Sequence, residues 1–232
     1  MQAISVFRVI KCMSWKIKLF FVLILCPGLG FSEPADYPIS ILIPTTYPYY
    51  PDVEQSMNIK GDWFSLLRLG DKKWTLKSTK VGNKISMGGV AGGHQQTVTS
   101  DYANTKYLLQ HVSLKEGVLS DTPISYKDYA SYVPIRENVC FNYSDIQYCM
   151  TENNGVAYIE TKDTRIFLGE IEDPDEDRYS ELSWAGDLNH DELLDIIVQY
   201  NFYDGYSACL YITTKIGSSE VLEKISCFHV GT

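Results

Sequence analysis

Beyond residue 33 the sequence lacks any apolar run of the roughly 18 residues that a bilayer-spanning helix needs. Glycine, with 16 residues, and proline, with 9, are too few in a chain of 232 residues for a collagen-like or linker protein. Hydrophobic residues make up 45% of the chain and charged residues 21%, which is enough to bury a core. We therefore expect one or two small globular domains and no mature transmembrane segment.

The sequence also lacks the motifs of common catalytic sites. It contains no Gly-x-Ser-x-Gly elbow, no His-Glu-x-x-His helix and no Walker loop, and the run Gly88 to Gly93 is better interpreted as a flexible loop. The four histidines are scattered along the chain, and a structural role is expected for each: His94, His111, His190 and His229. No catalytic residue is assigned.

The first 32 residues have the composition of a secretory signal peptide. They hold four cations and no acid, and an apolar run follows from Leu19 to Cys26. Gly30 and Ser32 are the small residues that predict cleavage before Glu33. Met13 is an alternative start that would give a leader of more usual length. The protein is therefore expected to be exported, to the periplasm or the extracellular space.

The charge balance is acidic. The whole chain carries a net charge of −9, and loss of the leader leaves 16 Lys and Arg against 29 Asp and Glu, a net charge of −13. Such a charge repels nucleic acid and anionic lipid and suits divalent cations or basic proteins. The same charge also serves solubility alone, so it does not by itself identify a partner.

Four cysteines remain after the leader, and an even number in an exported chain favours two disulfides. Three pairings of four cysteines are possible. Cys140 and Cys149 are equidistant from Ser144-Asp145, and Cys209 and Cys227 are equidistant from Ser218. Each pair can therefore face across a hairpin, which predicts Cys140–Cys149 and Cys209–Cys227.

The mature chain divides by composition into a segment rich in Pro and Tyr, residues 33–60, and a β domain, residues 61–232, with a possible subdivision near 130–138. The first segment is expected to be extended. Trp63 to Leu69 and Lys73 to Val81 flank Gly70-Asp71 and predict a β-hairpin with one buried face. Two further segments, Tyr107 to Leu114 and Tyr126 to Ile135, could form short strands or a helical turn, and their periodicity does not decide between the two.

The second half has a clearer β pattern, with Asn154-Gly155 as a tight turn. Strands are expected at 139–143, 146–150, 156–161, 165–171, 194–200, 208–214 and 220–228. The predicted fold is mainly β, an antiparallel meander or sandwich with little helix, and not a propeller.

The stretch from Trp184 to Val198 spaces oxygen donors as a calcium loop does. With Asp187 at position 1, donors follow at every second position: Asn189 at 3, Asp191 at 5, the Leu193 carbonyl at 7 and Asp195 at 9. Hard oxygen donors in this order can wrap one Ca²⁺. An EF-hand is excluded, because its bidentate Glu at position 12 is replaced by Val198 and a strand-like run follows in place of a helix.

About fifteen residues of this stretch resemble the calcium loop of FG-GAP repeats, which occur in integrin alpha-chain propellers and in exported bacterial proteins. The resemblance implies that Asp187, Asn189, Asp191 and Asp195 are side-chain ligands and that Leu193 gives its carbonyl. The family has Gly at position 6, where this chain has Glu192, and a left-handed conformation is costly for Glu. The motif occurs once, whereas a propeller needs several repeats.

A second acidic stretch has a similar spacing without the glycine, and predicts a further candidate metal site at Asp173, Asp175, Asp177 and Glu181. Its alternative interpretation is a solvated acidic loop.

Together these features predict an exported calcium-binding β protein that acts as a binding or interaction module for a protein or glycan partner. A narrower form is an envelope inhibitor or immunity-type protein directed at a basic toxin or enzyme. Two alternatives from other classes are a calcium-dependent secreted hydrolase acting on glycans, with carboxylates such as Asp175 and Glu181, and a purely structural envelope protein.

Overall fold

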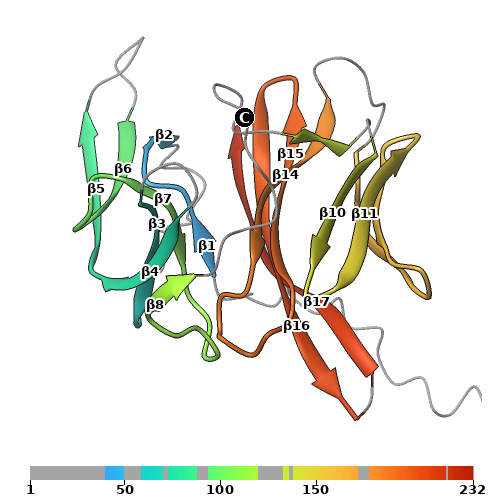
Figure 1. Cartoon of the computed structure of the whole chain (residues 1–232). Helices are drawn as coiled ribbons and strands as arrows, with labels where there is room; N and C mark the ends of the chain where they lie inside the picture. Colours follow the sequence, from blue (N-terminus) through green and yellow to red (C-terminus); the bar gives the residue numbers. More distant parts are fainter. Residues whose placement is uncertain are drawn as a thin grey trace, which may run out of the picture. The chain divides into compact units, whose positions relative to one another are not determined.

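The computed structural model describes most of the chain after residue 39 (Figure 1). The described residues are 40–49, 59–69, 73–87, 94–119, 133–135, 138–171, 178–217 and 219–231. They belong to one compact unit, Pro38–Thr232. The predicted leader, the Gly88 to Gly93 run and most of the second acidic stretch lie outside the described residues.

The described residues form antiparallel β-sheets, which confirms the predicted fold class. Sheet A has the order β1 (Ile41–Leu42), β7 (Thr105–Leu109), β3 (Trp63–Arg68), β4 (Trp74–Thr79) and β8 (Gly117–Leu119). Sheet B has the order β2 (Thr46–Tyr49), β6 (His94–Ser100) and β5 (Val81–Met87). Sheet C has the order β17 (Ser219–Gly231), β16 (Gly205–Ile216), β15 (Asp195–Phe202), β14 (Tyr179–Gly186) and β9 (Val133–Pro134). Sheet D is the meander β10 (Val139–Tyr143), β11 (Ile146–Asn153), β12 (Val156–Glu160) and β13 (Arg165–Glu170).

No described segment forms a helix with the length and apolar composition that crossing a bilayer requires.

The predicted hairpin is confirmed as β3 and β4, which pair from Trp63 with Thr79 to Arg68 with Trp74. Its second strand ends at Thr79, and Val81, expected in that strand, begins β5 of sheet B. Its burial differs from the prediction of one buried face. Trp74 and Leu76 are buried as expected, but Thr75 on the opposite face is also buried, and its hydroxyl donates to the Gly117 carbonyl at 2.8 Å. The reason is the neighbouring strand β8, which the sequence pattern does not indicate.

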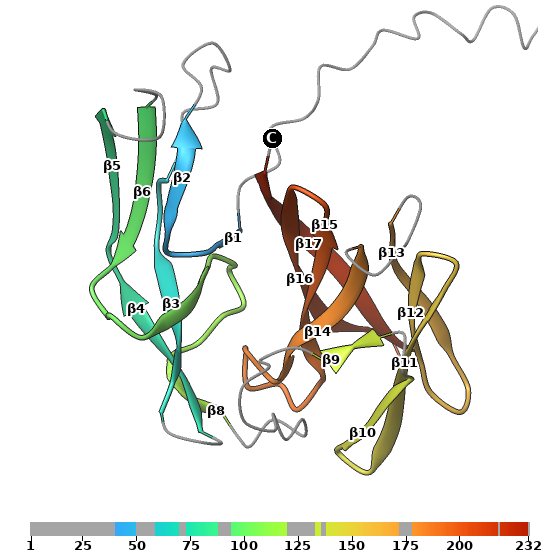
Figure 2. The same cartoon turned by 90° about the horizontal axis from the view of Figure 1, so that it is seen from above.

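Sheet C is covered on both faces, and its central strands are buried almost throughout (Figure 2). One face joins sheet A in a cluster that includes Trp184, Ile197 and Leu210, while the other joins sheet D through Leu182, Ile196 and Val198. Successive residues of a strand point to opposite faces, so a strand buried on both faces needs apolar residues at consecutive positions. The continuous run Ile196 to Val198 meets that requirement.

Sheet D turns where the sequence supplies residues that tolerate positive φ. Asn154 and Gly155 have φ of 50° and 80°, and Ser144 and Asp145 have φ of 46° and 63°. Asn, Asp and Gly accept this region at low cost, and two consecutive such residues match the twist of a hairpin. The predicted Asn154-Gly155 turn and the meander around it are therefore confirmed.

Both predicted disulfides, Cys140–Cys149 and Cys209–Cys227, are present. In each the two cysteines are direct register partners on neighbouring strands, as predicted from their symmetry about a turn. Disulfides of this kind persist in oxidising environments, so they are compatible with an exported protein.

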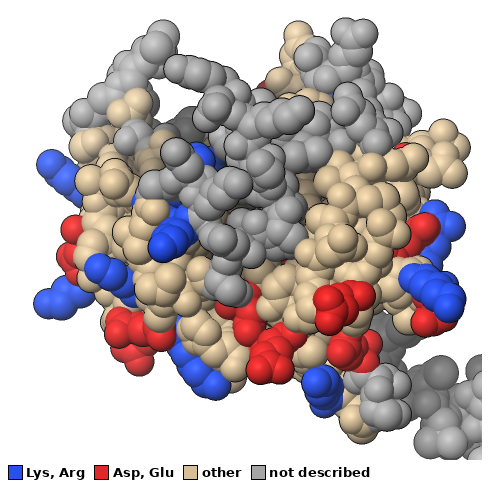
Figure 3. All heavy atoms as spheres, in the orientation of Figure 1, with Lys and Arg blue, Asp and Glu red and all other residues tan. Residues whose placement is uncertain are grey.

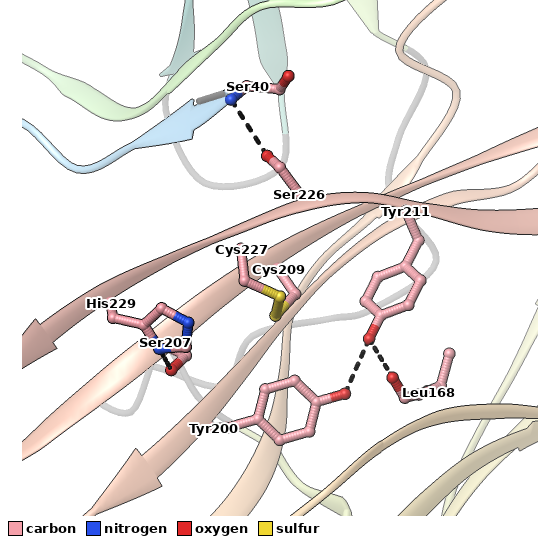
Figure 4. The surroundings of a disulfide bond; sticks show 9 residues. All are labelled: Ser40, Leu168, Tyr200, Ser207, Cys209, Tyr211, Ser226, Cys227 and His229. Atoms are coloured by element: carbon pink, nitrogen blue, oxygen red, sulfur yellow. Dashed lines mark hydrogen bonds between the residues drawn. A yellow bond between two sulfur atoms is a disulfide. The ribbon is translucent and has the colours of Figure 1, made fainter. Parts of the chain in front are cut away.

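Around Cys209–Cys227, polar side chains tie sheet C to sheet D (Figure 4). The Tyr200 hydroxyl lies 2.9 Å from that of Tyr211, which donates to the Leu168 carbonyl on β13. Leu168 is the extra residue of a β-bulge, because Gly169 pairs with Ala157 and Phe167 with Tyr158. Gly169 is needed here, since a Cβ atom at that position would lie 2.6 Å from the Tyr200 hydroxyl oxygen.

Candidate functional site

The predicted calcium loop connects β14 to β15 at the edge of both hydrophobic clusters. Gly186 and Asp195 pair across its base, and residues 187–194 form the loop itself. Leu188 is buried in the cluster between sheets A and C, and Leu194 in the cluster between sheets C and D. The two leucines therefore anchor the loop to two cores.

Asp187, the predicted first ligand, organises the loop backbone. Its Oδ1 accepts the amide N–H groups of Asn189 at 3.2 Å and Asp191 at 3.1 Å, and its Oδ2 accepts that of Glu192 at 2.8 Å. The Asp187 side chain is 8% exposed. A buried carboxylate that accepts three amides curls the following residues around itself.

Asn189 and Asp191 continue the same pattern. The Asp191 amide also lies 3.1 Å from Asn189 Oδ1, the Leu193 amide donates to Asp191 Oδ1 at 2.9 Å, and Asn189 Nδ2 donates to Asp191 Oδ2 at 2.9 Å. Asn189 is buried, whereas Asp191 is exposed. Asp187, Asn189 and Asp191 therefore lie along one short turn whose hydrogen bonds are made within the turn itself.

Asp195 closes the loop from the other end and is fully buried. Its Oδ2 accepts the Leu188 amide at 2.8 Å, and its Oδ1 accepts the Thr213 amide of β16 at 2.9 Å. Burial raises the pKa of Asp195 to about 7, the two amide hydrogen bonds oppose that rise, and the charges of Asp191 and Asp187 add to it. Asp187 and Asp195 are buried, so water screens these two carboxylates poorly, whereas Asp191 is exposed.

The backbone takes the left-handed conformation at two positions of this loop, His190 with φ of 58° and Glu192 with φ of 69°. Glu192 occupies position 6, where calcium loops carry Gly for a sharp turn. The loop therefore makes the left-handed turn at this position in spite of its side chain. That conformation costs a residue with a Cβ atom about 1–2 kcal/mol.

As they stand, the side chains bond the loop's own amides rather than converge on one point. Within the described ranges, no three His, Cys, Asp or Glu side chains are gathered closely enough to hold a metal ion. The donor chemistry fits a hard cation, since each predicted side-chain ligand offers an oxygen. An ion at this loop requires the carboxylates of Asp187, Asp191 and Asp195 to turn toward a common centre.

The surroundings of the loop include groups that the sequence did not indicate. Thr213 lies 18 residues from Asp195 and reaches it only through the pairing of β15 with β16. His190 is exposed, and its Nε2 would lie 2.7 Å from a Cβ atom at Gly117. Burial, followed by the charges of Asp187, Asp195 and Asp191, raises the pKa of Tyr143 to about 12. The loop therefore faces sheet D as well as β8.

The second acidic stretch stays a prediction, because Asp173, Asp175 and Asp177 lie outside the described residues. Its fourth member, Glu181, lies within β14 and is 1% exposed. The Ser183 hydroxyl donates to its Oε1 at 3.3 Å. Burial raises the pKa of Glu181 to about 7, against hydrogen bonds from Ser183 and Asn201 and the charge of Lys106. Glu181 is thus part of the packing between sheets.

Two of the remaining histidines each have a serine hydroxyl within hydrogen-bond distance of Nδ1. His111 Nδ1 lies 2.7 Å from the Ser113 hydroxyl, and His229 Nδ1 lies 2.5 Å from the Ser207 hydroxyl (Figure 4). These contacts agree with the structural role expected for both.

Comparison with known proteins found no matching family model, no matching curated protein and no matching solved structure. The resemblance to FG-GAP calcium loops therefore stays a prediction from the fifteen residues that carry it.

Proposed function

We propose that this protein is an exported, disulfide-bonded β protein that binds one Ca²⁺ at the 187–195 loop and acts as a binding module for a partner protein. The supporting observation is the loop itself: oxygen donors stand at alternate positions, and the backbone makes a left-handed turn at Glu192. The periplasm or the extracellular space is the proposed compartment, since cleavage after residue 32 leaves a chain with two disulfides.

Electrostatics support a cation at this loop. Burial raises the pKa of Asp195, and the neighbouring charges of Asp191 and Asp187 raise it further, which means that the ionised carboxylates repel one another. A divalent cation removes that repulsion by binding the charged forms together. When bound, Ca²⁺ would join the loop to the start of β15, and Asp195 would carry that connection on to Thr213 of β16.

A binding role is supported by the acidic surface and by a groove of about 1080 Å³ beside the loop. A groove of this volume exceeds the usual site of a small ligand. A narrower form of the proposal is an envelope inhibitor or immunity-type protein that engages a basic toxin or enzyme. The glycan-hydrolase alternative used Asp175 and Glu181, of which Glu181 is buried within β14.

Thermal unfolding of the purified protein in EDTA and in millimolar Ca²⁺ tests the calcium proposal. For a Kd of about 0.1 mM, 1 mM Ca²⁺ is about ten times the Kd and adds about 1.4 kcal/mol to the free energy of unfolding, so Tm should rise by about 3–6 °C. The variant Asp187→Asn/Asp191→Asn should lose this rise, because it removes two negative charges from the loop. An amide has one acceptor oxygen where a carboxylate has two, so the variant should also unfold at a lower Tm in EDTA, and the calcium-dependent difference in Tm is the readout.

The matched control is Asp62→Asn/Asp101→Asn, which removes the same charge from exposed positions in another part of the chain. It should keep the full calcium-dependent rise. Equal Tm values with and without Ca²⁺ for the unmodified protein would contradict the calcium proposal.

A further inference from the structure

A groove with a volume of about 1080 Å³ lies between sheet D and the hairpin of β16 and β17. Its walls are the β10–β11 turn, the β12–β13 turn and the start of β17. We refer to it as the acidic groove, and its lining residues are Asp145 to Cys149, Ile159 to Thr164, Ile166, Leu194, Thr213, Glu220 and Leu222.

The floor of the acidic groove is apolar and partly open. Leu194 and Ile159 are 3% exposed and belong to the cluster between sheets C and D, and Tyr148, Ile166 and Leu222 pack against that cluster. Ile146, at the mouth, is 37% exposed. An apolar side chain of a partner that covers this surface makes binding more favourable, because it removes apolar area from water.

The rim of the acidic groove is negatively charged. Asp145, Asp163 and Glu220 are exposed acids of the lining, and no hydrogen bond or ion pair joins their carboxylates to another described residue. The fourth acid, Glu160, is paired with Arg165 at 2.8 Å, and Lys162 is the cation of the lining. Burial, followed by the charge of Glu220, raises the pKa of Tyr148 on the floor.

The acidic groove is adjacent to the 187–195 loop. Leu194 belongs to the loop and also lines the groove. Thr213 lines the groove and contacts the loop, because its hydroxyl donates to the Leu194 carbonyl and its amide donates to Asp195. Figure 3 shows acidic side chains in the lower middle of the displayed face. The loop, whose exposed acids are Asp191 and Glu192, is therefore adjacent to the groove.

We propose that the acidic groove binds an extended, basic segment of a partner protein in which Lys or Arg side chains alternate with apolar ones. In an extended chain, successive side chains point to opposite sides, so alternate residues can reach the apolar floor while the others reach the acidic rim. This inference rests on the proposed function for the existence of a partner, but not on calcium binding. Charge complementarity selects a basic segment over an acidic or a neutral one.

Selection of a random twelve-residue peptide library against the purified protein in EDTA tests this inference. Enriched peptides should carry more Lys and Arg than Asp and Glu, together with apolar residues, and should bind more weakly as salt is raised. The variant Asp163→Lys/Glu220→Lys should weaken their binding by about tenfold or more, since it reverses two rim charges.

The matched control is Asp62→Lys/Glu170→Lys, which reverses two exposed acids outside the lining and should change binding by less than about twofold. If the first variant fails to fold, Asp145→Asn/Glu220→Gln replaces it, because Asn tolerates the φ of 63° at position 145. The inference would be overturned if no peptide were enriched, if the enriched peptides were neutral or acidic, or if their binding survived the rim changes. Because the selection runs in EDTA, its outcome is independent of whether the loop binds calcium.

Discussion

Glu192 has a backbone conformation that glycine adopts more readily than a residue with a side chain. Its φ of 69° lies in the left-handed region, and its amide donates to Asp187 Oδ2 at 2.8 Å. The hydrogen bonds of Asp187 to the loop amides hold the turn in place, so that the local strain is compensated by the loop as a whole.

The variant Glu192→Gly should stabilise the protein. Glycine removes about 1–2 kcal/mol of left-handed strain from the folded state, and the greater freedom of glycine in the unfolded chain costs about 0.5–1 kcal/mol, so the free energy of unfolding should rise by up to about 1.5 kcal/mol. Urea unfolding in EDTA measures this change without a contribution from Ca²⁺.

The matched control is Glu223→Gly, the same replacement at an exposed position inside β17. There the residue is not among those with positive φ, so glycine should destabilise the protein by about 0.5–1 kcal/mol. Equal destabilisation by both variants would show that position 192 is not strained.

At the residue scale the alternation of Asp187, Asn189, Asp191 and Asp195 is visible in the sequence, and their role as calcium ligands stays a prediction. The first three lie in the loop between β14 and β15, and Asp195 is the first residue of β15. The link from Asp195 to Thr213 was not predictable, because it depends on the register of β15 against β16. Register is a property of two strands, and periodicity within one strand does not fix it.

At the scale of elements, sheets C and D are joined by the chain of hydroxyl groups from Tyr200 through Tyr211 to the Leu168 carbonyl. The bulge at Leu168 leaves that carbonyl outside the regular ladder, and Tyr211 supplies its donor. A buried bulge is tolerated when its polar groups find partners from another element.

The variant Tyr211→Phe should therefore cost more than Tyr200→Phe. Loss of the Tyr211 hydroxyl leaves both the Leu168 carbonyl and the Tyr200 hydroxyl without that partner, at about 2–3 kcal/mol, whereas loss of the Tyr200 hydroxyl removes one hydrogen bond, at about 1 kcal/mol. Each variant lacks a single oxygen atom, so urea unfolding compares what the two hydroxyl groups contribute to the free energy of unfolding. The reverse order would contradict the bridging role of Tyr211.

Hairpins were the elements that the sequence predicted best. Gly70-Asp71 and Asn154-Gly155 predict hairpins, whose strands are neighbours in the chain, and the pairings of β3 with β4 and of β11 with β12 are found. Pairings between distant strands, such as β1 with β7 or β9 with β14, were not predicted. Nothing in a two-residue strand distinguishes it from a loop until its partner is present.

At the scale of the whole molecule, the continuous apolar run before Tyr200 is explained by coverage of sheet C on both faces. The sequence indicated a strand there but not that sheets A and D would both pack on it. The negative charge has a comparable explanation, since part of it is concentrated at the 187–195 loop and the rim of the acidic groove. A net charge predicts repulsion of anions, whereas its distribution selects a site for a cation.

Equilibrium dialysis against radioactive Ca²⁺ measures the central claim directly. We expect one Ca²⁺ per chain with a Kd at or below about 1 mM, the range of extracellular calcium modules. Binding should disappear in Asp187→Asn/Asp191→Asn and remain in Asp62→Asn/Asp101→Asn. Absence of bound Ca²⁺ at several times that concentration, or binding that the first variant leaves unchanged, would contradict a calcium site at this loop.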